Sequence, residues 1–140
     1  MACGEERIRI QEEIKPYCTN LIKNIRPIKL KNQIIHGDIS GNILFSKNKL
    51  PAIIDLSLYY SPADFALAVM VIDALVWEEV STKILSLYKN KKYFIQLLLR
   101  AELRRILEIW LCIEKLGSGN INNINKHKKL IDYLCKITRK

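Results

Sequence analysis

Apolar residues recur every three or four positions near the start of the chain, which is the spacing of one helical face. Residues 5–15 carry this pattern, and the same face continues to Ile25. Pro16 lies inside the pattern and is expected either to kink the helix or to start a second one. The sequence therefore predicts an N-terminal helical segment that ends before Arg26 and Pro27.

A second apolar stretch begins at Asp64 and is hydrophobic on almost every side. This pattern predicts a helix buried in a protein core, running past Trp77. Asp64 is expected to cap its first turn, because it follows Pro62 directly before the apolar run. Asp73 lies within the run, and a buried salt bridge is the expected explanation for it.

Two further amphipathic helices are predicted over residues 93–116 and 128–137. A glycine-containing stop at 117–119 and a polar loop at 120–125 are expected to separate them. Acidic and basic residues at helical spacing are expected to pair on the outer face of the first, namely Glu102 with Arg105 and Arg104 with Glu108. Cys112 and Cys135 stand among apolar neighbours and are expected to be buried thiols.

Three short strand-like runs interrupt the helical patterns, at residues 34–35, 43–45 and 51–55. They predict a small β-hairpin region between helices. With no internal repeat and no interdomain linker, the fold class expected is α+β, mainly α, as a single domain over residues 1–140.

Composition narrows the class of protein without identifying it. The chain has 140 residues, is 49% hydrophobic and carries a formal net charge of +9, which can attract phosphate, nucleic acid or an acidic surface. The lysines are scattered, so compositional drift is the favoured explanation and nucleic acid is not an expected partner. The four cysteines lack metal-site spacing, and neither a signal peptide nor an apolar run of about 20 residues is visible. A cytoplasmic, soluble protein without a membrane association is expected.

Polar residues cluster at the ends of the predicted strands, where apolar neighbours hold the backbone. His36, Asp38 and Asn42 follow the first strand, and Asp55 follows the third. Two carboxylates and an amide held in this way provide oxygen ligands for a hard cation such as Mg²⁺. A carboxylate that the metal does not fully use can accept a proton from a hydroxyl group.

This block resembles the catalytic and metal loops of the aminoglycoside phosphotransferase and choline-kinase-like family, distant relatives of the protein kinases. The H-G-D…N loop is matched by residues 36–42, and the I-D metal loop by Ile54 and Asp55. The resemblance extends over residues 34–68, about a quarter of the chain. It implies a kinase-like C-terminal lobe, with the catalytic and metal loops on a small hairpin region surrounded by helices.

The resemblance also implies a role for each residue. Asp38 would orient the acceptor hydroxyl and take its proton, and His36 would be the scaffold of this catalytic loop, its ring bonding backbone near the metal loop. Asn42 and Asp55 would hold Mg²⁺ against the phosphates of ATP, the co-substrate. Turn-forming carboxylates at strand ends are the alternative explanation for Asp38 and Asp55.

Three departures from the family pattern bear on this interpretation. Asn42 stands four residues after Asp38, where the family has five, so the loop is one residue short. Asp55 is followed by Leu56 and not by the sequence of a D-F-G segment. Only residues 56–63 separate Asp55 from the next predicted helix, which leaves no room for an activation segment and favours a small hydroxylated acceptor over a protein.

No glycine-rich phosphate loop precedes His36, and the residues before it are too few for a five-stranded nucleotide-binding lobe. The expected function is thus that of a phosphotransferase C-lobe, incomplete or inactive unless a separate N-lobe chain or self-association completes it. A non-catalytic remnant or binding module of the same fold is the first alternative. A basic protein that binds nucleic acid or an acidic partner is the second.

Overall fold

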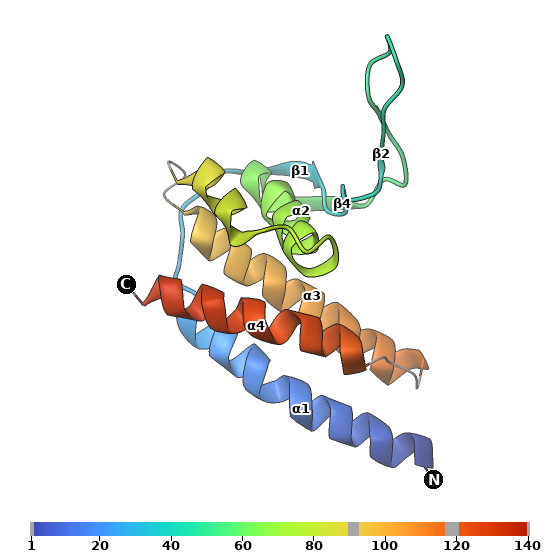
Figure 1. Cartoon of the computed structure of the whole chain (residues 1–140), viewed down its shortest axis with the longest axis vertical. Helices are drawn as coiled ribbons and strands as arrows, with labels where there is room; N and C mark the ends of the chain where they lie inside the picture. The colour runs from blue at the N-terminus through green and yellow to red at the C-terminus, as the bar shows by residue number, and fades with distance from the viewer. Residues whose placement is uncertain (1, 90–92, 117–120, 140) are drawn as a thin grey trace. The chain divides into compact units, whose positions relative to one another are not determined.

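The computed structural model describes residues 2–89, 93–116 and 121–139, and it is mainly helical with short antiparallel strands (Figure 1). This confirms the α+β, mainly α class. The helices are α1 (Ala2–Asn24), α2 (Ala63–Trp77), α3 (Phe94–Leu116) and α4 (Ile121–Thr138), with a 3₁₀ helix, η1 (Thr82–Tyr88). The strands are β1 (Asn32–His36), β2 (Ile43–Leu44), β3 (Ala52–Ile53) and β4 (Leu58–Pro62).

The chain divides into two compact units, and the boundary falls inside α3. Unit 1 comprises Met1–Pro27 with Leu99–Lys140, and unit 2 comprises Ile28–Leu98. The expectation of a single domain over residues 1–140 stays a prediction, and each unit is described by itself below.

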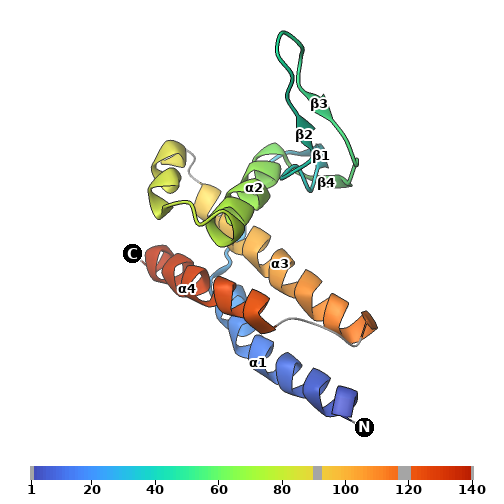
Figure 2. The same cartoon turned by 45° about the vertical axis from the view of Figure 1, so that its right-hand side comes forward.

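Unit 1 is a helical unit in which α1 and α4 pack along each other (Figure 2). Its core includes side chains that the periodicity placed inward, among them Ile14 and Leu21 of α1, Ile106 and Ile113 of α3, and Leu130 and Leu134 of α4. Ile131 of α4 is also fully buried, although the periodicity did not single it out. Pro16 lies inside α1, which continues through it as one helix. The expected polar loop at 120–125 is wrong from Ile121 on, because α4 already begins there; residues 117–120 lie outside the described part.

Two expectations for side chains of unit 1 are wrong. Glu102 does not lie on the outer face of α3: it is fully buried, with its Oε1 2.8 Å from Nδ1 of the equally buried His127. Cys112 is exposed, whereas Cys135 is buried as expected. Arg104 and Glu108 do pair, at 2.7 Å, and Arg105 joins the same carboxylate at 2.8 Å.

Unit 2 contains two antiparallel ribbons and the apolar helix α2. β1 pairs with β4, in register from Asn32 with Pro62 to His36 with Leu58, and β2 pairs with β3. α2 packs against β1 and β4 and buries Ala68, Val69 and Ile72. Figures 1 and 2 both show the β2–β3 hairpin extending away from the β1–β4 ribbon. The first three strands confirm the sequence prediction, but β4 was missed.

The predicted course of α2 is wrong at both ends. The helix does not run past Trp77: Glu79 adopts a φ of 53°, and the Val80 N–H donates to the Ala74 carbonyl at 3.2 Å, so the chain turns out of the helix. Asp64 is not the cap, because Pro62 holds that position without a side-chain hydrogen bond. Asp64 lies instead in the first turn, where its negative charge interacts favourably with the positive end of the helix dipole. Asp73 is buried, as its place in the apolar pattern indicated.

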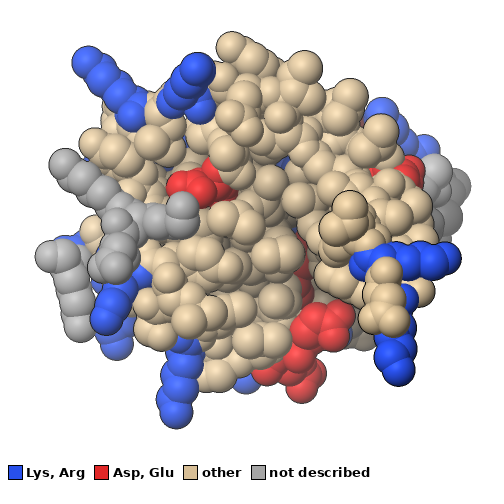
Figure 3. All heavy atoms as spheres, turned by 90° about the horizontal axis from the view of Figure 1, so that it is seen from above, with Lys and Arg blue, Asp and Glu red and all other residues tan. Residues whose placement is uncertain are grey.

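No helix within the described ranges combines the length and the apolar character needed to cross a bilayer. On the face drawn in Figure 3, Lys and Arg side chains project mainly at the margin, and Asp and Glu form a few small groups. Neither sign of charge covers that face continuously.

Candidate active site

The candidate residues lie in two loops that connect the same two ribbons of unit 2. Residues 37–42 lead from β1 to β2, and residues 54–57 lead from β3 to β4. Because β1 pairs with β4 and β2 pairs with β3, the two loops must run side by side. Hydrogen bonds close both ends: the Gly37 N–H donates to the Ser57 carbonyl at 2.7 Å, and the Ile54 N–H donates to the Asn42 carbonyl at 3.0 Å. The sheet register thus brings the segment containing Asp38 and Asn42 next to the segment containing Asp55.

The His36 ring bridges the two loops. Its Nδ1 accepts the Asp38 backbone N–H at 3.1 Å, and its Nε2 lies 3.3 Å from the Ile54 carbonyl. Nδ1 must be without a proton to accept this bond, and Nε2 must carry a proton to donate to the carbonyl. The neutral ring with its proton on Nε2 meets both requirements. This contact with backbone beside Asp55 is of the kind that the family resemblance implies for His36, and it fixes the start of the first loop against the second.

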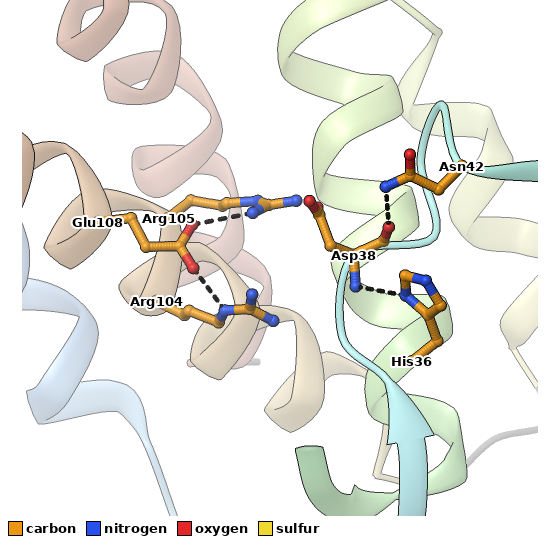
Figure 4. A network of polar contacts seen from close by, with 6 residues as sticks. All are labelled: His36, Asp38, Asn42, Arg104, Arg105 and Glu108. Atoms are coloured by element: carbon orange, nitrogen blue, oxygen red, sulfur yellow. Dashed lines mark hydrogen bonds and ion pairs between the residues drawn. The ribbon is translucent and has the colours of Figure 1, made fainter. Parts of the chain in front are cut away.

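Asn42 turns back toward Asp38, as Figure 4 shows. Its side-chain Nδ2 donates to the Asp38 carbonyl at 2.8 Å, and its backbone N–H donates to the Ile39 carbonyl at 2.9 Å. Because the loop is one residue shorter than in the family, its sequence does not fix the direction of the Asn42 side chain. With Nδ2 bonded to Asp38, the amide orientation is set, and Oδ1 is the atom that can serve a cation.

Asp38 and Asp55 differ in their surroundings. Asp38 is half-buried in the first loop, and Asp55 is exposed in the second. Asp55 adopts a left-handed backbone with φ of 50°, a conformation that Asp tolerates better than most residues. This conformation lets the chain bend from β3 into β4 within four residues.

Two glycines shape the first loop for different reasons. Gly41 has a φ of +78°, and a Cβ added there would meet no atom within 4 Å, so its backbone conformation is what favours glycine. Gly37 is buried, and a Cβ there would clash with Cδ2 of the Tyr59 ring and lie only 2.6 Å from its Cε2. Tyr59 is therefore a supporting residue that the sequence prediction missed, although Leu58, Tyr59 and Tyr60 have the composition of a strand.

The two loops carry three oxygen-bearing side chains of the kind that binds a hard cation, Asp38, Asn42 and Asp55. In Figure 4 the carboxylate of Asp38 points away from Asn42, which faces only the Asp38 backbone carbonyl. This set suits Mg²⁺, which takes one or two carboxylates and keeps several waters. Among the residues that the structure describes, no group of three or more His, Cys, Asp or Glu side chains gathers as a metal site. The candidate set is of a different kind, since one of its three members is an amide.

Comparisons of the chain with models of protein families, with curated proteins and with solved structures found no match. The resemblance over residues 34–68 therefore rests on the motif, and the geometry of the two loops is independent of it.

Proposed function

We propose that unit 2 carries the catalytic and metal loops of an ATP- and Mg²⁺-dependent phosphotransferase with a kinase-like C-terminal lobe, acting on a small hydroxylated molecule. The observation that supports this most is the bridge made by His36. One ring ties the Asp38 backbone to the segment that leads into Asp55, and Asn42 closes the same loop onto Asp38. Turn-forming carboxylates alone would not need a histidine between two loops.

In the proposed reaction the residues act through position and charge. Asp38 would accept the proton of the acceptor hydroxyl as its oxygen attacks the γ-phosphorus of ATP and ADP leaves. Asp55 and Oδ1 of Asn42 would hold Mg²⁺, which supplies positive charge against the phosphate oxygens. Phosphoryl transfer depends mainly on such positioning and charge neutralisation. His36 would take no part in proton transfer, because both ring nitrogens already face backbone groups.

An exposed apolar surface accompanies the two loops. Ten large apolar side chains between Ile34 and Tyr60 are more than a third exposed, with Leu50 at 91% and Phe45 at 78%. Burying a large apolar side chain contributes about 1.5–3 kcal/mol at about 25 cal/mol per Å², which corresponds to about 60–120 Å² per side chain. Scaled by their exposed fractions, the ten side chains together expose roughly 400–750 Å². Successive strand residues such as Tyr59 and Tyr60 face opposite sides of the ribbon, so this total is divided between two faces. Exposed apolar side chains in this number nevertheless favour a partner at the ribbons.

The proposal therefore includes a nucleotide-holding lobe from another segment or chain, which would cover these side chains. Without it, we expect concentration-dependent self-association in sedimentation velocity experiments. Replacing Phe45 and Leu50 by Ser should reduce the association, since these two side chains are among the most exposed. A monomer at every concentration tested would contradict the role given to this surface.

The catalytic assignment is tested by calorimetric titration with ATP. Because residues 1–35 contain no glycine-rich phosphate loop, we expect these 140 residues to bind ATP weakly, with a Kd on the order of 1 mM. Removing Mg²⁺ should abolish it, and Asp55→Asn should do the same by removing the charge of a metal ligand. Asp38→Asn should leave binding nearly intact, because that carboxylate would serve the acceptor.

Glu114→Gln is the charge-matched control, since Glu114 is exposed on α3 in unit 1 and should leave ATP binding unchanged. ATP binding that needs no metal and survives Asp55→Asn would place the nucleotide elsewhere and end these assignments. Binding that depends on Asp55 and Mg²⁺ without any transfer to acceptors, even at high protein concentration, would favour a non-catalytic module of the same fold.

A further inference from the structure

The basic character of the protein is concentrated in one of its units. Unit 1 contains 15 Lys and Arg against 8 Asp and Glu, a net charge of +7, whereas unit 2 contains 8 against 6. The charges of unit 1 come from both ends of the sequence and include the basic stretch at 126–140. The helices of this unit therefore gather charges that lie far apart in the sequence.

A hollow of about 560 Å³ lies along α1 of unit 1, next to Arg139, which directly follows α4. Lys15, Lys23 and Arg139 line it, together with the acidic Glu12. A second hollow of about 380 Å³ shares Asn20 and Arg139 with the first and adds Lys136 and Asp132. We refer to the two together as the α1–α4 groove, to which the described residues contribute four cationic and two acidic side chains.

The polar face of α1 explains why a groove forms there. Glu12, Lys15, Pro16, Thr19, Asn20 and Lys23 repeat at alternating spacings of three and one, so they share one side of the helix. On the other side, Ile14 and Leu21 are fully buried. Arg139 extends from the end of α4 to this polar face, where its Nη2 lies 3.4 Å from Oδ1 of Asn20.

The ion pairs described for unit 1 involve cations that lie outside the α1–α4 groove. Arg104 and Arg105 pair with Glu108 along α3, and Lys128 pairs with Glu13 at 2.7 Å. None of these three cations lines the groove.

We infer that the α1–α4 groove binds the phosphate backbone of single-stranded nucleic acid. Lys15 and Lys23 are two turns apart on α1, about 12 Å along the helix axis. Cations this far apart can contact separate phosphates along an extended strand, whereas one compact anion would not reach both. The side-chain Nδ2 of Asn20 can add a hydrogen bond to a phosphate oxygen, whereas the Thr19 hydroxyl already donates to the Lys15 carbonyl at 2.9 Å.

The lining also determines what kind of binding to expect. Among the described residues, no aromatic side chain lines either hollow, so bases have no ring on which to stack. Binding is then carried by charge, which makes it insensitive to sequence and strongly dependent on salt. If all four cations contact phosphates, the logarithm of the binding constant falls with the logarithm of salt at a slope of about −2.8, or about fifty-fold between 50 and 200 mM.

The test measures fluorescence anisotropy of a labelled oligouridine of about 12 nucleotides with the full chain, over a salt series. The variant Lys15→Gln, Lys23→Gln, Arg139→Gln should bind more weakly and reduce the slope by about 2. The matched control, Lys31→Gln, Lys47→Gln, Lys49→Gln, removes the same charge from exposed positions of unit 2 and should keep the wild-type slope. Circular dichroism of all three proteins checks that the helices are intact.

A competition experiment distinguishes recognition of the phosphates from recognition of other parts of the RNA. Inorganic polyphosphate of similar phosphate number should displace the oligouridine, because only the phosphates are contacted. Displacement by unlabelled RNA but not by polyphosphate would overturn the inference. Equal losses in the groove variant and in the unit 2 control would also overturn it, since net charge alone would then explain the binding.

Discussion

The close approach of the Tyr59 ring to Gly37 predicts that any side chain at residue 37 destabilises the candidate catalytic loop. A Cβ at residue 37 would clash with Cδ2 of the Tyr59 ring and lie 2.6 and 2.9 Å from its Cε2 and Cγ. Carbon atoms pack at about 3.5–4.0 Å, so in Gly37→Ala the ring or the loop must retreat by more than about 1 Å. Such overpacking typically costs about 1–3 kcal/mol of the free energy of unfolding.

A double-mutant cycle measured by urea denaturation isolates this effect. Tyr59→Ala removes the ring, at a cost reduced by its 39% exposure, and leaves room for the new methyl group. Gly37→Ala should therefore cost at least about 1 kcal/mol less in the Tyr59→Ala background than in the wild type.

Gly41→Ala is the control for the cycle. Nothing lies near its Cβ position, but its φ of +78° makes Ala cost about 1–2 kcal/mol for backbone reasons alone. That cost should be the same, within about 0.5 kcal/mol, with or without the Tyr59 ring. If Gly37→Ala were equally destabilising in both backgrounds, the close approach of Tyr59 would not be the reason for glycine, and the role given to Tyr59 would be wrong.

Two further predictions concern unit 1. Iodoacetamide should alkylate the exposed Cys112 before Cys18 and Cys135, as site-resolved mass spectrometry would show. Burial raises the pKa of the Cys18 and Cys135 thiols, so less of each is thiolate at neutral pH and their alkylation should accelerate only at higher pH than usual; faster reaction of Cys135 would contradict its burial. Glu102→Ala should destabilise the protein by about 3–5 kcal/mol in urea denaturation, because it leaves His127 buried without the carboxylate it contacts. The exposed Glu114→Ala should change stability by no more than about 0.5 kcal/mol, and a similar value for Glu102→Ala would refute the buried pair.

Periodicity along the chain was sufficient for the helices and for three of the four strands. Regular spacing reports which face of an element is buried, so the cores of α1, α3 and α4 could be predicted from positions such as Ile14, Ile106 and Leu134. It does not report where an element ends. α2 stops at Trp77 because Glu79 adopts a left-handed backbone, and no apolar pattern encodes that turn.

Contacts between residues far apart in the sequence could not be predicted, because helix packing brings the partners together. Glu102 has the spacing of a surface ion pair with Arg105, but it is buried by a helix that begins about 20 residues later, where it meets His127. The groove between α1 and α4 likewise joins Lys15 and Lys23 to Arg139, more than a hundred residues away. Charge gathered in this way is visible only after the helices pack.

For the candidate site, the sequence by itself determined which residues are the candidates: His36, Asp38, Asn42 and Asp55 stand at strand ends, and the proposed function assigns their oxygen and nitrogen atoms to phosphoryl transfer. Only the tertiary structure decided how they are held. The missed strand β4 pairs with β1, and this pairing makes the two loops neighbours and presses Tyr59 against Gly37. A strand is stabilised by its partner across the sheet, so its position depends on contacts that local sequence does not contain.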